Sequence, residues 1–187
     1  MRLFIAISFP QSLRQRMVEA TDPLREQGFP VRWIDPDQLH LTLKFLGDVK
    51  RNRLEDVTAV MDEVGSDFRP FEVGFERVGA FPSLRSPRVI WLGVEATMEM
   101  RAVKHDLEHG LVDMGFERET RAFQPHVTLA RADQDADAGD FRKLESLSRE
   151  VEMDETHRVA QIDLVQSHLR SSGAEYERIH GSRLTAE

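Results

Sequence analysis

The chain has 187 residues, of which 40% are hydrophobic and 31% charged, so it can bury a sizeable core and is not typical of disordered or fibrous proteins. It contains no cysteine, which excludes disulfides, thiol nucleophiles and thiolate metal sites. The net charge of −8 argues against a broad electrostatic grip on nucleic acid, but it leaves room for a small anionic group in a locally basic pocket.

The first half of the chain alternates between strand-like and helix-like patterns. An apolar, β-rich run at residues 2–9 predicts a strand, and the apolar stripe at residues 13–24 predicts a helix. A further strand carries the motif His40-Leu41-Thr42-Leu43. A second helical stripe follows at residues 54–64, and an alternating run at residues 71–75 predicts another strand.

The second half repeats these patterns 86 residues later. The motif returns as His126-Val127-Thr128-Leu129, and residues 88–95 again read as a strand. A helical stripe at residues 103–114 precedes the motif, and a second stripe at residues 141–147 follows it. An alternating run at residues 159–164 completes the series, so the expected order in each half is β-α-β-β-α-β.

This repeat predicts an α+β fold with two pseudo-symmetric lobes, roughly residues 1–86 and 87–172, followed by a C-terminal strand and tail. Each lobe is expected to be an antiparallel sheet with two helices, and the lobes together form a single bilobal domain, residues 1–187. The active-site cleft is expected between the two sheets. The acidic stretch at residues 132–140 has low apolar content and predicts a solvated loop.

The paired motifs suit acid–base chemistry on a phosphate. Alternate side chains of a strand share a face, so His40 points with Thr42, and His126 with Thr128, while the intervening apolar residues enter the core. One imidazole can take a proton from water while the other gives a proton to a leaving oxygen. The two hydroxyls can donate hydrogen bonds to the non-bridging phosphate oxygens. This chemistry requires no metal and no other cofactor.

Two cations follow the motifs. Lys44 continues the face of His40 and Thr42, and Arg131 lies just beyond the second motif, so each can add a charge-assisted contact to the phosphate. Strict alternation would put Arg131 on the far side of its strand. Its role therefore requires a β-bulge or the end of the strand.

An ordinary half-buried strand histidine would explain either motif on its own. The second copy changes the balance, because packing accounts for the threonine and leucine better than for the histidine. Both copies also carry extended flanking sequences: Arg2-Leu3-Phe4-Ile5-Ala6-Ile7, His40-Leu41-Thr42-Leu43-Lys44-Phe45-Leu46-Gly47, Gly79-Ala80-Phe81-Pro82, Pro87-Arg88-Val89-Ile90-Trp91-Leu92-Gly93 and Pro125-His126-Val127-Thr128-Leu129-Ala130-Arg131. With these flanks, nearly the whole chain resembles the two-histidine phosphoesterase superfamily, and within it the RNA 2′,3′-cyclic phosphodiesterases, historically called 2′-5′ RNA ligases.

The resemblance implies hydrolysis of RNA or nucleoside 2′,3′-cyclic phosphate ends to a 2′-phosphate, with reversible 2′-5′ ligation as the opposite direction. It implies that His40 is the proton donor to the leaving 3′ oxygen and that His126 is the proton acceptor from water. The residues alone do not assign these two roles. The resemblance also places Arg131 near the phosphate and an aromatic ring against the base, for which Phe9 is a weak candidate that core packing explains better.

Two other functions compete with this interpretation. His105-Asp106-Leu107-Glu108-His109 fits the H-x-x-E-H signature of a zinc peptidase, but the apolar stripe of the same predicted helix leaves both histidines on its polar side. An RNA-end binding module without turnover is the non-enzymatic alternative, and the presence of both histidines and both threonines disfavours it. No apolar stretch approaches the roughly 18 residues that span a bilayer, so we expect a cytoplasmic monomer with no membrane partner.

Overall fold

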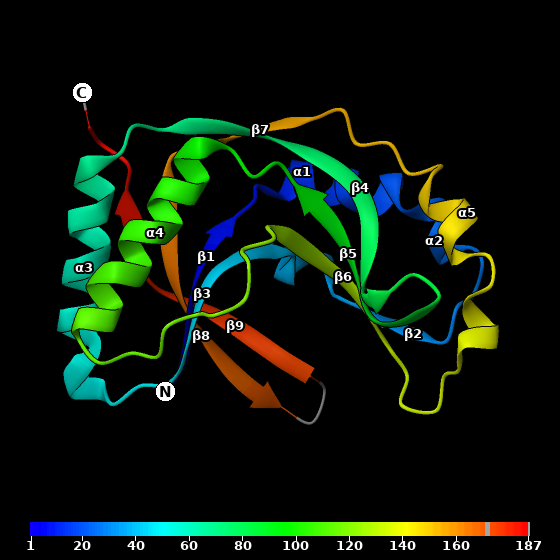
Figure 1. Ribbon diagram of the computed structural model, residues 1–187, viewed down its shortest axis with the longest axis horizontal. Coiled ribbons are helices and arrows are strands. Elements are labelled where there is room, and N and C mark those ends of the chain that lie inside the picture. The colour runs from blue at the N-terminus through cyan, green and yellow to red at the C-terminus, as the bar shows by residue number, and fades with distance from the viewer. Residues whose placement is uncertain (171–172, 187) are drawn as a thin grey trace.

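The computed structural model describes residues 1–170 and 173–186 (Figure 1). Residues 171, 172 and 187, at the predicted end of the second half and of the tail, lie outside the described residues. The strands are β1 (Arg2–Ser8), β2 (Val31–Trp33), β3 (His40–Asp48), β4 (Phe71–Ser83), β5 (Ser86–Val94), β6 (His126–Ala132), β7 (Thr156–Val159), β8 (Gln161–Arg170) and β9 (Gly173–Arg183). The α-helices are α1 (Gln11–Ala20), α2 (Asp22–Arg25), α3 (Leu54–Asp67), α4 (Met98–Asp113) and α5 (Leu144–Ser148), and short 3-10 turns lie at Pro36–Gln38, Arg51–Arg53 and Ala138–Phe141.

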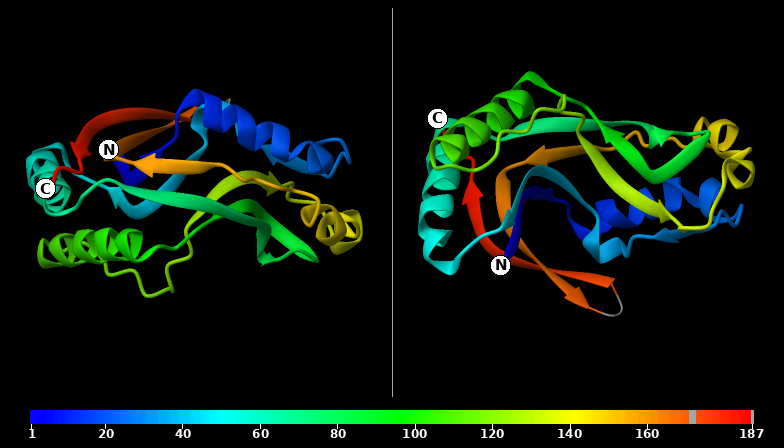
Figure 2. Two further views of the ribbon diagram at one scale, coloured as in Figure 1. Left: turned by 90° about the horizontal axis from the view of Figure 1, so that it is seen from above. Right: turned by 60° about the horizontal axis from the view of Figure 1, so that its bottom comes forward.

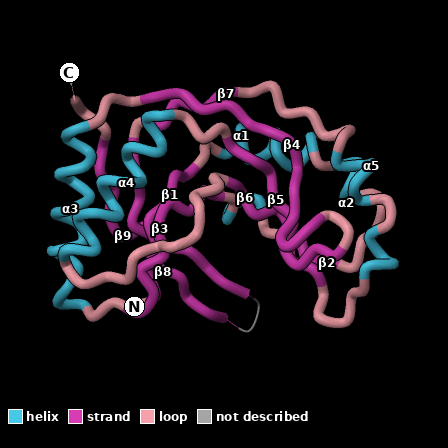
Figure 3. Tube along the Cα trace, in the orientation of Figure 1, coloured by secondary structure: helices cyan, strands magenta, loops and turns pink. Residues whose placement is uncertain are grey.

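The strands form a curled antiparallel sheet in the order β7-β4-β5-β6-β3-β1-β8-β9, with β2 paired to β6 beside this path (Figure 3). The predicted α+β architecture with two pseudo-symmetric lobes is confirmed. One lobe contains β1, β3, β8 and β9, and the other contains β2, β4, β5, β6 and β7.

The lobes differ from the two sequence halves in one respect. β4 belongs to the first half but pairs with β5 and β7, while β8 belongs to the second half but pairs with β1 and β9. The prediction that residues 1–86 and 87–172 each form their own sheet is therefore wrong for the last strand of each half. β4 is exchanged because it turns directly into β5 as a hairpin, and this short connection pairs it with a strand of the second half.

The second half also lacks one predicted strand. β2 precedes β3 in the first half, but the corresponding stretch between α4 and β6 contains no strand among the described residues. Its backbone instead serves a buried ion pair: the carbonyl of Glu117 accepts a hydrogen bond from Lys44, and the N–H of Glu119 donates one to Glu108. These bonds replace the ladder that a strand would form.

The two lobes meet where β3 and β6 touch. Leu41 and Val127, which occupy the same position in the two motifs, pair directly with each other across this seam. Both side chains are completely buried, and burial of each contributes about 1.5–3 kcal/mol. The pseudo-two-fold axis therefore passes between the two motifs, which brings their histidines and threonines to the same place on the sheet.

The helices lie at the two ends of the molecule. α3 and α4 pack together at one end, and α1, α2 and α5 lie at the other, so each end combines helices from both halves (Figures 1 and 2). Buried apolar residues from both halves form one continuous cluster beneath the sheet. None of the described helices combines the length and apolar character needed to cross a membrane.

Candidate active site

Each motif strand contains a β-bulge directly after its threonine. In β3, Thr42 pairs with Ala6 but Lys44 pairs with the adjacent Ile5, so Leu43 is an extra residue. The same irregularity occurs in β6 at Leu129, which is the equivalent position. A bulge interrupts the strict alternation of side chains, and its effect on the next residues decides which of them reach the site.

The bulge in β6 brings Arg131 to the face that carries His126 and Thr128. Leu129 and Ala130 are both buried, and Arg131 is exposed. The positive charge of Arg131 lowers the pKa of both motif histidines, as expected for a cation on the same face of the sheet as the two rings. The sequence required a β-bulge or a strand end before Arg131 could share a face with His126, and the structure contains the bulge.

The two imidazoles are held in the same way. Nδ1 of His40 lies 2.7 Å from the carbonyl oxygen of Gln38, and Nδ1 of His126 lies 2.7 Å from that of Gln124. A carbonyl oxygen only accepts, so Nδ1 carries the proton in both rings and Nε2 is the atom presented for reaction. In the first motif Nε2 lies 3.1 Å from the hydroxyl oxygen of Thr42, which fixes the ring at both nitrogens.

Burial and neighbouring positive charge lower the pKa of both rings and so favour their neutral form. Burial lowers the pKa of His40. The charges of His126 and Arg131 lower this pKa further, and the hydrogen bond to the Gln38 carbonyl raises it. Burial also lowers the pKa of His126, again with a contribution from Arg131 and against the Gln124 carbonyl. A negatively charged phosphate bound between the rings would favour the protonated imidazole and so raise both pKa values.

Lys44 does not lie at the site, and the prediction that it contacts the phosphate is wrong. The bulge at Leu43 turns Lys44 into the core, where its side chain is only 3% exposed. Its Nζ lies 2.6 Å from Oε1 of Glu108, while Lys104 lies 2.9 Å from the other oxygen of the same carboxylate. Lys44 is therefore a structural cation that joins β3 to α4.

Phe9 is also absent from the site, so its suggested stacking against a base is wrong. It is 3% exposed and packs against Phe75 and His157, with ring centroids 5.8 Å and 5.1 Å away. This is the core packing that the sequence favoured as the alternative for Phe9.

Four other aromatic rings surround the motif histidines. Phe4 and Tyr176 lie 4.9 Å and 5.1 Å from the ring of His40. Phe81 and Trp91 lie 5.2 Å and 5.8 Å from the ring of His126. The sequence motifs do not identify these four rings as site residues, although alternation along the first strand places Phe4 and Ala6 together on one face and so points to Phe4.

Trp91 fits beside His126 because Gly79 has no side chain. A Cβ at Gly79 would overlap the indole ring, so that any larger residue would displace Trp91. The indole N–H of Trp91 is buried and has no hydrogen-bond partner among the described residues. A buried donor of this kind favours a partner, and a bound polar group could supply one.

Comparison with known proteins identifies the family. A family model described as the 2′-5′ RNA ligase superfamily matches residues 9–170. The chain belongs to this superfamily. It is 31% identical over 183 residues to an RNA 2′,3′-cyclic phosphodiesterase of Methanothermobacter thermautotrophicus, with 98% of each chain covered. It is 36% identical over 131 residues to a protein of the same name from Archaeoglobus fulgidus, covering 70% of this chain and 72% of the relative.

Solved structures of similar proteins share the whole fold. TT0787 of Thermus thermophilus matches with a TM-score of 0.84 at 28% identity, and the match covers 100% of both chains. E. coli LigT in complex with 3′-AMP matches with a TM-score of 0.75 at 23% identity over 98% of each chain. The curled sheet of this chain is thus a fold that it shares with these solved structures.

Glu108, the glutamate of the H-x-x-E-H sequence on α4, has a structural role. Glu108 is buried between Lys44 and Lys104, and hydrogen bonds from Lys44, the N–H of Glu119 and Lys104 lower its pKa to about 2 against the opposing effect of burial. His109 points away, with a side chain that is 69% exposed. A carboxylate bound by two lysines is a poor general base for a zinc peptidase, so the geometry disfavours that alternative.

Proposed function

We propose that this chain hydrolyses the 2′,3′-cyclic phosphate at the end of an RNA or a nucleoside and leaves a 2′-phosphate. The observation that carries this proposal is the pairing of two imidazoles at the pseudo-two-fold axis, each held by a main-chain carbonyl and each with a pKa lowered by the nearby charge of Arg131. Relatives that match most of the chain and are named RNA 2′,3′-cyclic phosphodiesterases support the same reaction.

In the proposed reaction, Nε2 of His126 accepts a proton from water as the water oxygen bonds to phosphorus. The bond between phosphorus and the 3′ oxygen then breaks, and Nε2–H of protonated His40 donates its proton to that oxygen. The products are a 2′-phosphate monoester and a free 3′ hydroxyl. The proton gained by His126 and that lost by His40 are exchanged with solvent before the next cycle.

Three other residues assist the phosphate. Thr42 and Thr128 donate hydrogen bonds to its non-bridging oxygens, where negative charge grows in the transition state. Arg131 adds a charge-assisted hydrogen bond and offsets the charge of the bound anion. Burial and Arg131 lower the pKa of His40, and the incoming anion raises it again. His40 is therefore more readily protonated when substrate is present.

The assignment of acid to His40 and of base to His126 follows the resemblance to the family. Because the motifs are related by the pseudo-two-fold axis, the same pair can exchange roles in the reverse, ligating direction. We further propose that the partner is an RNA or oligonucleotide end with a cyclic phosphate, and that the protein acts as a cytoplasmic monomer without metal or cofactor.

The test is incubation of the protein with a 2′,3′-cyclic nucleotide and with a cyclic-phosphate-ended oligonucleotide, each with and without a chelator. We expect a 2′-phosphate product at the same rate in both conditions. A 3′-phosphate product would contradict the proposed direction of cleavage, and loss of activity with chelator would contradict a reaction that needs no metal. Binding of both substrates without turnover would instead support an RNA-end binding module.

A further inference from the structure

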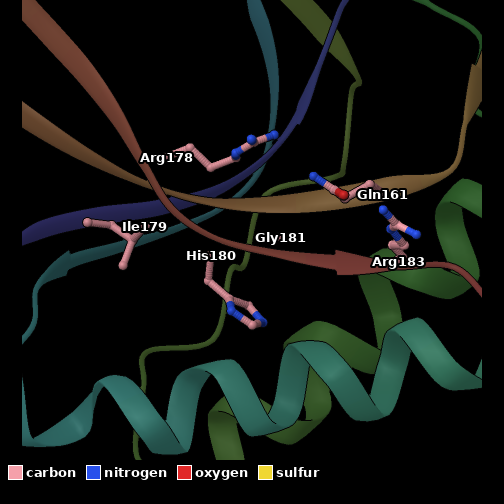
Figure 4. A pocket seen from close by; sticks show the side chains of 6 residues that line it. All are labelled: Gln161, Arg178, Ile179, His180, Gly181 and Arg183. Carbon is pink, nitrogen blue, oxygen red and sulfur yellow. The ribbon is translucent and has the colours of Figure 1, made fainter.

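A second polar pocket lies on β8 and β9, outside the pair of histidines. Its volume is about 400 Å³, and it is lined by Gln161, Arg178, Ile179, His180, Gly181 and Arg183 (Figure 4). His180 turns toward α3, where its Nε2 lies 2.7 Å from Asp62, whereas Arg178 extends in the opposite direction toward β1. The pocket thus presents two arginines on the side of the sheet away from α3.

This side is the face that carries the catalytic histidines, which we call the site face. Two rows of cross-strand partners run from β1 through β8 to β9: Phe4, Val165 and Arg178 in one row, and Ala6, Asp163 and Gly181 in the other. Directly opposed residues share a face of the sheet. The ring of Phe4 lies 4.9 Å from that of His40, so Arg178 and His40 occupy the same face.

Apolar residues line the sheet between the histidine pair and the arginine pocket. Phe4, Ala6 and Val165 form a small buried cluster that is separate from the main core. Two strands, β1 and β8, separate β3 from β9, which corresponds to about 14 Å at the usual spacing of neighbouring strands. Tyr176 of β9 reaches the ring of His40 across this span, whereas Arg178 lies beside Asp163 of β8, so the arginines border the histidine pair at a position suited to another group of the same ligand.

Neighbouring side chains in the pocket orient the guanidinium of Arg178. The carboxylate of Asp163 is only 4% exposed, lies 3.9 Å from Arg178 and accepts a hydrogen bond of 2.6 Å from Gln161. This buried carboxylate orients the guanidinium and balances part of its charge. Gly181 keeps the space open, because a Cβ there would lie 2.5 Å from Nε2 of Gln161.

We propose that this pocket binds a backbone phosphate of the RNA strand a few nucleotides upstream of the cyclic end. The inference rests on the proposed function and specifies its substrate as an oligonucleotide rather than a mononucleotide. A planar guanidinium matches a phosphate in geometry and charge. In a chain with a net charge of −8, two arginines on the site face provide a local exception to the overall repulsion of nucleic acid.

The test compares two substrates with the same terminal base, a 2′,3′-cyclic mononucleotide and a cyclic-phosphate-ended oligonucleotide. The double variant Arg178→Gln/Arg183→Gln should lower kcat/KM about tenfold for the oligonucleotide and leave it unchanged for the mononucleotide. It should also flatten the salt dependence of the oligonucleotide reaction, because fewer phosphate charges are neutralised. The double lysine variant, which keeps the charge, should recover much of the loss.

The matched control is Arg142→Gln, which removes an exposed arginine beside α5 at the far end of the molecule. Equal losses on both substrates, no loss on the oligonucleotide, or an equal loss in the control would each overturn the proposal. Affinity for a 2′-phosphate-ended oligonucleotide, measured by fluorescence anisotropy, tests the pocket without turnover. If the wild type hydrolyses neither substrate, the proposed function fails; if wild type and double variant bind this oligonucleotide equally, the pocket proposal fails.

Discussion

The two motif strands are built alike up to the bulge and differ directly after it. In β3 the residues that follow the bulge are buried Lys44 and exposed Phe45, and in β6 they are buried Ala130 and exposed Arg131. The scaffold thus provides two equivalent positions on the site face. One is occupied by an apolar ring and the other by a cation.

The two halves also differ in how the segment before each motif strand is attached to the sheet. β2 pairs with β6 alongside Arg131, whereas the equivalent loop of the second half is attached to β3 through Lys44 and Glu108. The duplication therefore determines where the histidines meet. The divergent residues make the site directional, because the exposed position after the bulge holds the ring of Phe45 in β3 and the guanidinium of Arg131 in β6.

The largest effect is expected from the equivalent part of the two motifs. His40→Ala and His126→Ala should each lower kcat by about 10²–10⁴, because each removes one proton transfer. Steady-state assays on the 2′,3′-cyclic mononucleotide measure this loss. The matched control is His109→Ala, an exposed histidine of α4 that should retain full activity. Normal turnover in either motif variant would contradict the mechanism, and an inactive control would show that the loss is not specific to the motif histidines.

The next prediction concerns the buried residues that follow the bulges. Lys44→Met should destabilise the fold by about 3–5 kcal/mol, because it breaks a buried ion pair and leaves Glu108 with Lys104 alone. We expect kcat/KM of the folded variant to change by less than about threefold, a barrier change below about 1 kcal/mol. Urea unfolding and the mononucleotide assay measure the two quantities. A large loss of activity at unchanged stability would show that Lys44 does reach the phosphate.

The same ion pair gives a pH dependence. The pKa of Glu108 is lowered to about 2 in the folded protein, from its ordinary value of 4.5. Its carboxylate therefore stabilises the fold fully above pH 4.5, and this contribution is lost as the pH falls toward 2. Glu108→Gln should reduce the dependence of the free energy of unfolding on pH in this interval. An unchanged dependence would show that Glu108 is not a source of the acid sensitivity.

The repeat in the sequence was sufficient to predict the paired motifs, their common face and the antiparallel α+β fold. It could not predict which sheet receives β4 and β8, because the pattern of a strand identifies its faces and not its partner. The bulges at Leu43 and Leu129 were equally hidden, since an extra residue next to a buried one leaves the apolar pattern almost unchanged. Lys44 was misplaced for this reason, and its partner Glu108 lies 64 residues away in the chain.

A smaller effect is expected from the cation at the exposed position. Arg131→Gln should lower kcat/KM about ten- to a hundredfold, the value of a hydrogen bond from a charged group. Arg131 lowers the pKa of both His40 and His126, so its removal should raise both values and move both limbs of the pH–rate profile to higher pH. A pH–rate profile with limbs at their wild-type positions would show that Arg131 does not act on the imidazoles.

The smallest effect is expected at the equivalent position in β3. The side chain of Phe45 is 68% exposed, and its ring lies 6.0 Å from that of Phe4. Phe45→Ala removes little buried area, so it should change stability by about 0.5 kcal/mol or less and kcat/KM by less than about threefold. Thermal unfolding and the mononucleotide assay, run beside Arg131→Gln, compare the two positions directly. If Phe45→Ala lost as much activity as Arg131→Gln, the exposed positions after both bulges would contribute equally, and the directional site inferred from their difference would be wrong.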